Sequence, residues 1–310
     1  MSNIDVSIVT WNSAKVIGSL FESLRKQTLL PTKIFIVDNA STDHIQEICR
    51  SYPEVTLIPQ KTNIGFAAGH NVAIKRSSAD YILVVNPDVV LNPQYIETLV
   101  IYASSHPKCA SFVGTVFQNF EKDLIDTTGL QIKSWRIIRE RTIRDSLPQE
   151  VFGISGAVAF YRKKALEDIK IKEQYFNELY FAYKEDVELA WRFRWAGWSA
   201  VYVPAAKAQH SRAIGVDTPL SDRGAYQRVL SYRNHLLLYT SVENFQTLFL
   251  DLWVIIPAEL LRFISLFFRD MKSTLQALAE VRKLWHSART FANGITRRVP
   301  ARTIRAAFKL

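Results

Sequence analysis

The sequence predicts an α/β protein with a mixed, mostly parallel sheet covered by helices on both faces, followed by a helical C-terminal region. Over the first hundred residues, short and almost continuously apolar runs alternate with segments of helical periodicity. Beyond residue 235 the pattern becomes helical and aromatic, and the last 30 residues are basic. Hydrophobic residues make up 48% of the 310 residues, which is enough for a large core and excludes a disordered chain.

The first hundred residues predict a strand and helix alternation. The apolar runs predict strands at residues 6–10, 33–37, 55–58 and 81–85. The segments between them predict helices over about 16–24, after a cap at Ser41 or Thr42, and over 69–77. In parallel sheets, ligands bind beyond the carboxyl ends of the strands. Residues 10–12, 38–39 and 86–88 fall at those ends and are therefore candidates for a binding site.

The middle of the chain mixes patterns typical of strands and of helices. Residues 152–160 predict a turn that enters a buried strand, residues 185–195 predict a helix, and residues 201–203 predict a strand that Pro204 ends. We expect one α/β domain over residues 1–235 and a helical, amphipathic and basic region over residues 236–310.

The basic residues are concentrated at the end of the chain. Lys and Arg number 39 against 29 Asp and Glu, a formal net charge of +10. Residues 281–310 hold eight basic residues and no acidic one, and residues 236–280 hold three basic and five acidic residues. Residues 1–235 therefore carry only +4. We see no nucleic-acid-binding module in this body and expect no nucleic-acid partner.

The two cysteines, Cys49 and Cys109, suggest no disulfide framework, and the N-terminus lacks the pattern of a signal peptide. No run reaches the roughly 18–20 apolar residues needed to cross a bilayer. These features predict a cytoplasmic protein.

Acidic residues gather at the predicted strand and helix ends. Asp38 and Asp88 each follow an apolar strand, and Glu185 and Asp186 begin a helix. Asp alone is a common turn residue, but several carboxylates at one sheet edge repel one another unless a cation or ligand donors offset their charge. Mg²⁺ and Mn²⁺ take oxygen ligands and commonly bridge to phosphates, so we expect one of them here.

Six motifs follow one another between about residues 5 and 212. They are Val9-Thr-Trp-Asn12, Val37-Asp-Asn-Ala-Ser-Thr-Asp43, Asn63-Ile-Gly-Phe-Ala-Ala-Gly-His-Asn71, Asn86-Pro-Asp-Val89, Gly153-Ile-Ser-Gly-Ala157, and Tyr180-Phe-Ala-Tyr-Lys-Glu-Asp-Val-Glu-Leu189 with Gly197, Trp198 and His210. In this order and spacing they resemble the inverting family 2 glycosyltransferases of GT-A fold. Within that family, the Asn-Pro-Asp and Glu-Asp-Val-Glu-Leu forms are most similar to bacterial rhamnosyltransferases of cell-wall and surface-polysaccharide assembly.

The resemblance implies a nucleotide-sugar site. Asp38 would accept a hydrogen bond from the imide N–H of uracil or thymine. Asp88 and His210 would hold the metal on the diphosphate, and Asn86 stands where many relatives have Asp. The implied donor-binding residues are Thr10, Asn12, Asp38, Asn39, Asn63, Gly65, Asn71, Asn86, Asp88, Ser155, Gly156 and Ala157.

The resemblance also implies the catalytic residues. Inverting transfer needs a carboxylate that deprotonates the acceptor hydroxyl, and Asp186 is the expected base. Glu185 beside it would contact the acceptor or shape the site, and Glu188 could be only a solvated charge. The first expectation for the donor is dTDP-L-rhamnose, with a UDP-hexose or UDP-N-acetylhexosamine as the alternative. The expected acceptor is lipid-linked or a growing surface polysaccharide.

The C-terminal quarter is apolar and aromatic, with Asp251, Glu259, Arg262 and Arg269 at intervals that predict a polar stripe on amphipathic helices. One interpretation is a helical appendage packed on the catalytic domain or on a second subunit of a homo-oligomer. The other is an in-plane anchor on the inner face of the cell membrane, where the basic tail would contact anionic lipid. We favour the membrane. A basic nucleic-acid- or membrane-binding protein without catalysis is the less favoured alternative to an enzyme.

Overall fold

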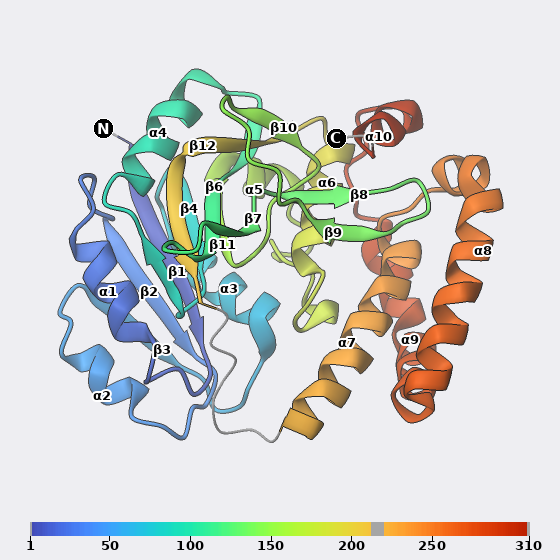
Figure 1. Cartoon of the computed structure of the whole chain (residues 1–310), viewed down its shortest axis with the longest axis horizontal. Helices are drawn as coiled ribbons and strands as arrows, with labels where there is room; N and C mark the ends of the chain where they lie inside the picture. The colour runs from blue at the N-terminus through green and yellow to red at the C-terminus, as the bar shows by residue number, and fades with distance from the viewer. Residues whose placement is uncertain (1, 212–219, 309–310) are drawn as a thin grey trace.

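The computed structural model describes residues 2–211 and 220–308. Among these residues, ten strands form one mixed sheet in the order β10-β12-β6-β11-β4-β1-β2-β3, with β5 beside β12 and β7 beside β6 (Figure 1). The strands are β1 (Ile4–Thr10), β2 (Lys33–Asp38), β3 (Val55–Pro59), β4 (Tyr81–Val85), β5 (Val89–Leu91), β6 (Cys109–Asn119), β7 (Leu124–Thr127), β10 (Gln149–Val151), β11 (Val158–Arg162) and β12 (Ser199–His210).

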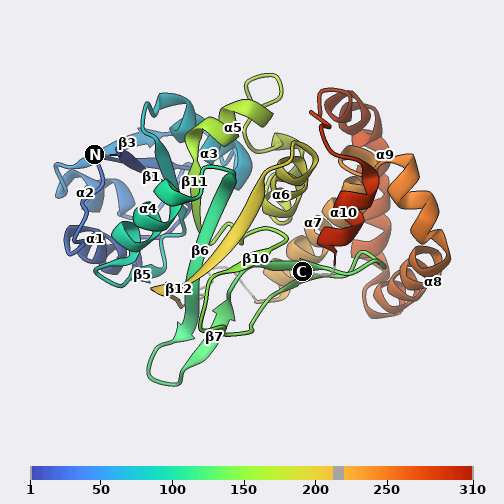
Figure 2. The same cartoon turned by 90° about the horizontal axis from the view of Figure 1, so that it is seen from above.

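Strands β3, β2, β1 and β4 are parallel, as the apolar runs predicted. The register places Thr10 at the end of β1 beside Asp38 at the end of β2. The helices of this α/β part cover both faces of the sheet (Figure 2), and the predicted fold class is confirmed. These helices are α1 (Ile17–Arg25), α2 (Ile45–Arg50), α3 (Gly65–Arg76), α4 (Tyr95–Ser105), α5 (Lys163–Ile169), the short η1 (Glu178–Tyr180) and α6 (Glu185–Trp195).

Three boundaries differ from the prediction. Helix α2 begins after His44 without a side-chain cap, because the Ser41 hydroxyl donates to Asp38 instead. Helix α3 begins at Gly65, four residues earlier than expected. Strand β12 continues through Pro204, because its pairing with β6 shifts register between Tyr202 and Lys207 and the missing proline N–H is not needed there.

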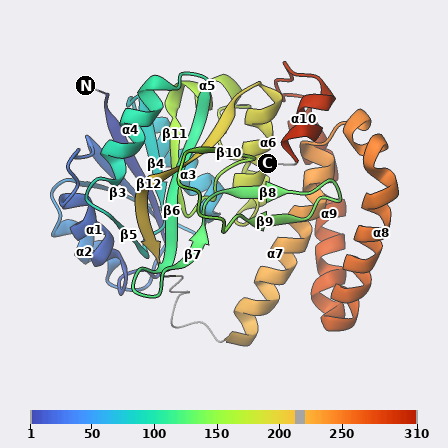
Figure 3. The ribbon, with the colours of Figure 1, turned by 45° about the horizontal axis from the view of Figure 1, so that its top comes forward.

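The C-terminal helices stand beside the sheet, with α8 outermost in all three views (Figures 1, 2 and 3). They are α7 (Leu220–Ser241), α8 (Phe245–Arg269), α9 (Met271–Ala292) and α10 (Ala301–Ala307). Side chains of α7, α9 and α10 share a core with Phe152, Trp191 and Trp195 of the α/β part. Helix α7 passes through residue 235, where we expected the domain boundary. In the part of the chain that the structure describes, no helix is both long and apolar enough to cross a membrane.

A hairpin of β8 (Leu130–Ile132) and β9 (Ile138–Glu140) extends from the sheet to these helices (Figure 3). Arg136 in its turn is buried and forms ion pairs with Glu243 and, at 3.0 Å, with Asp251. Arg305 also reaches Asp251, at 2.7 Å. The hairpin therefore ties the α/β part to the start of α8.

Helix α8 is amphipathic with its polar stripe turned inward. Asp251 is buried, and Glu259 pairs with His235 and Arg262. The outward face of the helix is apolar and carries no charge before Arg269 at its end. Its exposed hydrophobic side chains are Phe245, Phe249, Leu250, Trp253, Ile256, Leu260, Leu261, Ile264 and Phe268.

Some basic residues of the C-terminal segment 281–310 are engaged in ion pairs within the protein. Arg298 forms an ion pair with Asp168 at 2.6 Å, and Arg305 is engaged with Asp251. Lys309 lies outside the described residues. The eight basic residues therefore do not act as one independent cationic segment.

Candidate active site

The turn Ser155–Ala157 links the groups at the carboxyl end of β4. The backbone N–H of Gly156 donates to Oδ2 of Asp186 at 2.9 Å, and the Ser155 hydroxyl donates to Glu140 at 3.1 Å. The carbonyl of Ala157 accepts from the backbone N–H of Asn86 at 2.9 Å. The structure thus brings this turn, Asn86 and Asp186 together.

Asp186 and Glu185 start helix α6 but have different surroundings. Glu185 is buried, and its Oε2 has no hydrogen-bond partner among the described residues. Burial and the neighbouring charge of Asp186 raise the pKa of Glu185 to about 8. Burial also raises the pKa of Asp186, but the N–H groups of Gly156 and Val187 lower it in part. Of the two, Asp186 is the partly exposed one, so its carboxylate can take a proton from a ligand.

Glu140 is a third carboxyl group at this turn, which our reading of the sequence missed. It accepts from Thr127 at 2.5 Å and from Ser155 at 3.1 Å. Burial is the main reason that its pKa rises to about 7, and the charge of Asp186 adds to the shift. In the sequence Glu140 stands among basic residues, and only the β8–β9 hairpin carries it to Ser155.

Asp88 and His210 lie side by side at the expected metal position. Oδ1 of Asp88 is 3.4 Å from Nε2 of His210, and the Asn86 amide is 3.4 Å from the same nitrogen. Octahedral ligands at about 2.1 Å from Mg²⁺ or Mn²⁺ are about 3 Å apart, so the pair fits two neighbouring ligand positions. In the described ranges 2–211 and 220–308, no three His, Cys, Asp or Glu side chains form a ready metal cluster.

Asp126 orients His210. Its Oδ2 accepts from Nδ1 of His210 at 2.8 Å, and its side chain is buried. Histidines that bind metals usually donate their other ring N–H to such a carboxylate. Burial alone would lower the pKa of His210, but its bonds to Asp126 and Asp88 raise it to about 9. No motif in the sequence marked Asp126.

The second half of the expected site surrounds Asp38. Asp38 is fully buried, and it accepts hydrogen bonds from Thr10 at 3.3 Å, from Ser41 and, at 2.9 Å, from Gln46. A pyrimidine base could reach this carboxylate only after Gln46 moved aside. Asn12 is exposed and accepts from the N–H of Thr42 at 2.8 Å.

The other residues that we expected to contact the nucleotide-sugar donor form hydrogen bonds within the protein in this structure. The buried Asn71 side chain forms hydrogen bonds with residues 175, 176 and 178. Asn39 donates to the carbonyl of Gly65, and Asn63 accepts from the N–H of Gly65. Gly65 has a φ of +85°, and a Cβ there would lie 2.5 Å from Phe181. Gly65 therefore lets Phe181 approach the backbone closely, whereas we had expected a nucleotide beside this glycine.

Glu188 is not a solvated charge. It is completely buried, and both of its oxygens accept from Arg192 at 2.9 Å. Arg192, one turn further along the same helix, also donates to the carbonyls of Ile169 and Tyr175, so this buried pair is part of the contact between α6 and residues 169–175.

Comparison with known proteins identifies similar sequences. Residues 5–170 match the family model "Glycosyl transferase family 2". The chain is 26% identical over 239 residues to the N-acetylglucosaminyl-diphospho-decaprenol L-rhamnosyltransferase of Mycobacterium tuberculosis, covering 68% of this chain and 76% of that protein. It is 26% identical over 199 residues to the rhamnosyltransferase WbbL of Escherichia coli, covering 57% of this chain and 72% of that protein.

A solved structure with a similar fold is the mannosyltransferase PcManGT from Pyrobaculum calidifontis, in complex with GDP-Man and Mn²⁺. The TM-score is 0.54 at 14% identity, over 99% of this chain and 87% of that chain. At this identity the similarity shows the fold alone.

Proposed function

The chain belongs to glycosyl transferase family 2, and we propose that it transfers L-rhamnose from dTDP-L-rhamnose to a lipid-linked or growing surface-polysaccharide acceptor. The single observation that carries the chemistry is the partly exposed carboxylate of Asp186, which Gly156 holds beside the turn that also contacts Asn86. The donor rests on the names of the two rhamnosyltransferases to which the chain is similar.

In the proposed reaction, Asp186 takes the proton of the acceptor hydroxyl as that oxygen attacks the anomeric carbon. The new bond joins the acceptor oxygen to this carbon. The bond from the carbon to the phosphate oxygen breaks, and the nucleoside diphosphate leaves with the electron pair. Because attack and departure occur on opposite faces, the configuration inverts. Glu185, whose pKa is raised to about 8 by burial and by the charge of Asp186, lies beside this base.

The leaving diphosphate needs positive charge beside it. Asp88 and His210 would hold Mg²⁺ or Mn²⁺, and such an ion, when bound, offsets the charge that develops on the leaving oxygen. Asp126 fixes the His210 ring, and Asn86 supplies a neutral amide next to it.

We further propose that the protein associates with the inner face of the cell membrane through α8. The outward face of α8 is apolar along its length, and basic residues lie at both ends of the helix. Arg269 and Lys272 follow its last apolar turn, and Arg302 lines the same surface hollow as Phe245 and Phe249. An apolar helix face with flanking cations fits an anionic bilayer surface. This position would bring the enzyme to a lipid-linked acceptor.

The test of the transfer reaction is a donor screen with Mn²⁺ or Mg²⁺. Release of nucleoside diphosphate is measured with and without a lipid-linked acceptor. Acceptor-dependent turnover of dTDP-L-rhamnose is expected. Turnover of a UDP-hexose or UDP-N-acetylhexosamine instead would identify that nucleotide sugar as the donor. Asp38 would bind either nucleotide, because uracil and thymine share the imide that it would recognise. No acceptor-dependent release from any donor would refute the proposal.

A further inference from the structure

A cavity of about 280 Å³ lies beside the catalytic carboxyl groups, among the β8–β9 hairpin and helices α7 and α8. Lys184, two residues before Asp186, lines it. Ile138, two residues before Glu140, also lines it, and so does Leu266 of α8. The cavity therefore lies between the loop before Asp186 and helix α8, and Lys184 in its wall is close enough to Asp186 to interact with it electrostatically.

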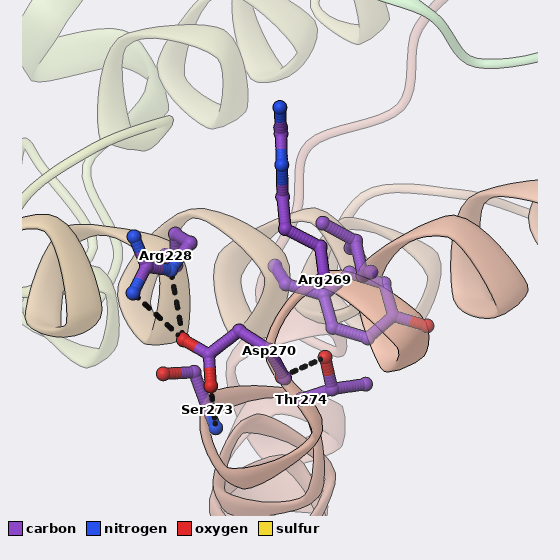
Figure 4. Close-up of a pocket in the computed structure, with 7 residues that line it drawn as sticks. Arg228, Arg269, Asp270, Ser273 and Thr274 are labelled. Atoms are coloured by element: carbon purple, nitrogen blue, oxygen red, sulfur yellow. Dashed lines mark hydrogen bonds and ion pairs between the residues drawn. The ribbon is translucent and has the colours of Figure 1, made fainter.

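The wall of this cavity is cationic. Lys184, Arg228 and Arg262 line it, and among the described residues no Asp or Glu does. Arg262 is paired with Glu259. The guanidinium of Arg228 is paired with Asp270 at 2.8 Å, and Arg269 extends away from Asp270 (Figure 4).

Lys184 differs from the two arginines because no described carboxylate forms an ion pair with it. Its ammonium donates to the hydroxyl of Ser231 at 3.3 Å. Burial lowers the pKa of Lys184, which shows that the surroundings disfavour its charge, although Asp186 offsets part of this effect. A partly buried ammonium with unused donors is a suitable contact for a phosphate oxygen.

The order of these features matches the order of parts in a sugar linked to a lipid through a diphosphate. The acceptor sugar must reach Asp186. The diphosphate follows the sugar, and the Lys184 ammonium in the cavity wall lies within electrostatic reach of Asp186. The lipid chain follows the diphosphate, and α8, which supplies Arg262 and Leu266 to the cavity, carries exposed apolar side chains beside them in the sequence, such as Leu261 and Ile264.

We infer that this cavity binds the diphosphate of a prenyl-diphosphate-linked acceptor, with the Lys184 ammonium on a phosphate oxygen. This inference rests on the proposed function and extends it by assigning a site to the acceptor's diphosphate. Lys184 is thus an acceptor-binding residue that selects diphosphate-linked sugars over sugars on uncharged carriers.

The test compares wild-type protein with Lys184→Gln in two assays. The first measures binding of farnesyl diphosphate and of farnesol by calorimetry on the full chain, without donor. The second measures KM for one acceptor sugar presented either on a short prenyl diphosphate or as an alkyl glycoside. Lys283→Gln, which removes an exposed lysine from α9, is the matched control, and Lys184→Arg restores the charge. Melting temperatures identify a variant that fails to fold.

We expect Lys184→Gln to weaken farnesyl diphosphate binding at least tenfold and to raise KM for the diphosphate acceptor by a similar factor. Farnesol binding, KM for the alkyl glycoside and the Kd of the nucleoside diphosphate should not change, and Lys184→Arg should recover most of the loss. Equal effects on both acceptors, or weaker nucleoside diphosphate binding, would overturn the inference. Lys184-dependent farnesyl diphosphate binding without any sugar transfer would instead refute the proposed reaction and leave the site standing.

Discussion

The backbone N–H of Gly156 donates to Oδ2 of Asp186 at 2.9 Å, while the N–H of Val187 donates to its Oδ1 at 2.7 Å. Two backbone donors therefore fix the orientation of this carboxylate and favour its charged form. The same turn contacts Asn86 and Glu140, so a change in either of these groups should affect the position of Asp186.

Asp186→Asn should reduce kcat by about 10²–10⁴-fold, because the amide cannot take the acceptor proton. The Kd of the nucleoside diphosphate should stay unchanged, since Asp186 faces the acceptor in the proposed reaction. Asn can keep only one of the two backbone hydrogen bonds, so melting temperatures must accompany the kinetics. Asp123→Asn, at an exposed position, is the control. Near wild-type turnover in Asp186→Asn would remove Asp186 as the base.

Glu140→Gln should raise stability at alkaline pH relative to wild type. The folded-state pKa of Glu140 is about 7, above its ordinary value of 4.5, so the folded protein binds this proton more tightly. The resulting stabilisation is fully present below pH 4.5 and is lost as the pH rises through 7. Gln has no proton to lose, so the variant should gain a few degrees in melting temperature over wild type between pH 4.5 and pH 8. The exposed Glu121→Gln should show no such trend, and an equal trend in both variants would contradict the assignment.

Asp126→Ala should lower the affinity for Mn²⁺ about 10–100-fold, because it removes the carboxylate that orients His210. Asp126→Asn should have a smaller effect, since its amide oxygen can still accept from Nδ1. Mn²⁺ binding in the presence of nucleoside diphosphate can be measured by electron paramagnetic resonance, independently of turnover. Unchanged Mn²⁺ affinity in both variants would exclude this role for Asp126.

The sequence predicted the acidic groups at the carboxyl ends of buried strands. Asp38 is the last residue of β2 and Asp88 lies three residues after the end of β4, so their place at one sheet edge follows from local pattern and parallel topology. Asp126 and Glu140 could not be found in this way, because long-range pairing of β7 and of the β8–β9 hairpin carries them to the site. Likewise, spacing identified the polar stripe of α8, but whether that stripe faced solvent depended on Arg136, far away in the sequence.

A double substitution Trp253→Glu and Ile256→Glu should abolish binding to vesicles that contain anionic lipid. Both side chains are exposed, at 77% and 60%, on the outward face of α8. Each would contribute about 1.5–3 kcal/mol if buried in lipid, so at least a tenfold loss in a sedimentation assay is expected. Ile101→Glu, at a 65% exposed position on α4, is the matched control. If the wild-type protein does not bind vesicles but forms a dimer that the double variant cannot form, the apolar face of α8 packs against a second subunit instead.

Arg136→Met tests whether the C-terminal helices support the active site. Removing the guanidinium leaves Glu243 buried without its ion pair and leaves Asp251 with Arg305 only. Loss of one partner of a buried pair costs about 3–5 kcal/mol, which urea unfolding can measure. Because the same hairpin carries Glu140 to Ser155, kcat should also fall under conditions where the variant is still folded. Arg139→Met changes an exposed residue of the same hairpin and should alter neither quantity. A variant of Arg136 that loses stability but keeps full kcat would show that α8 anchors the hairpin without positioning the turn at Asp186.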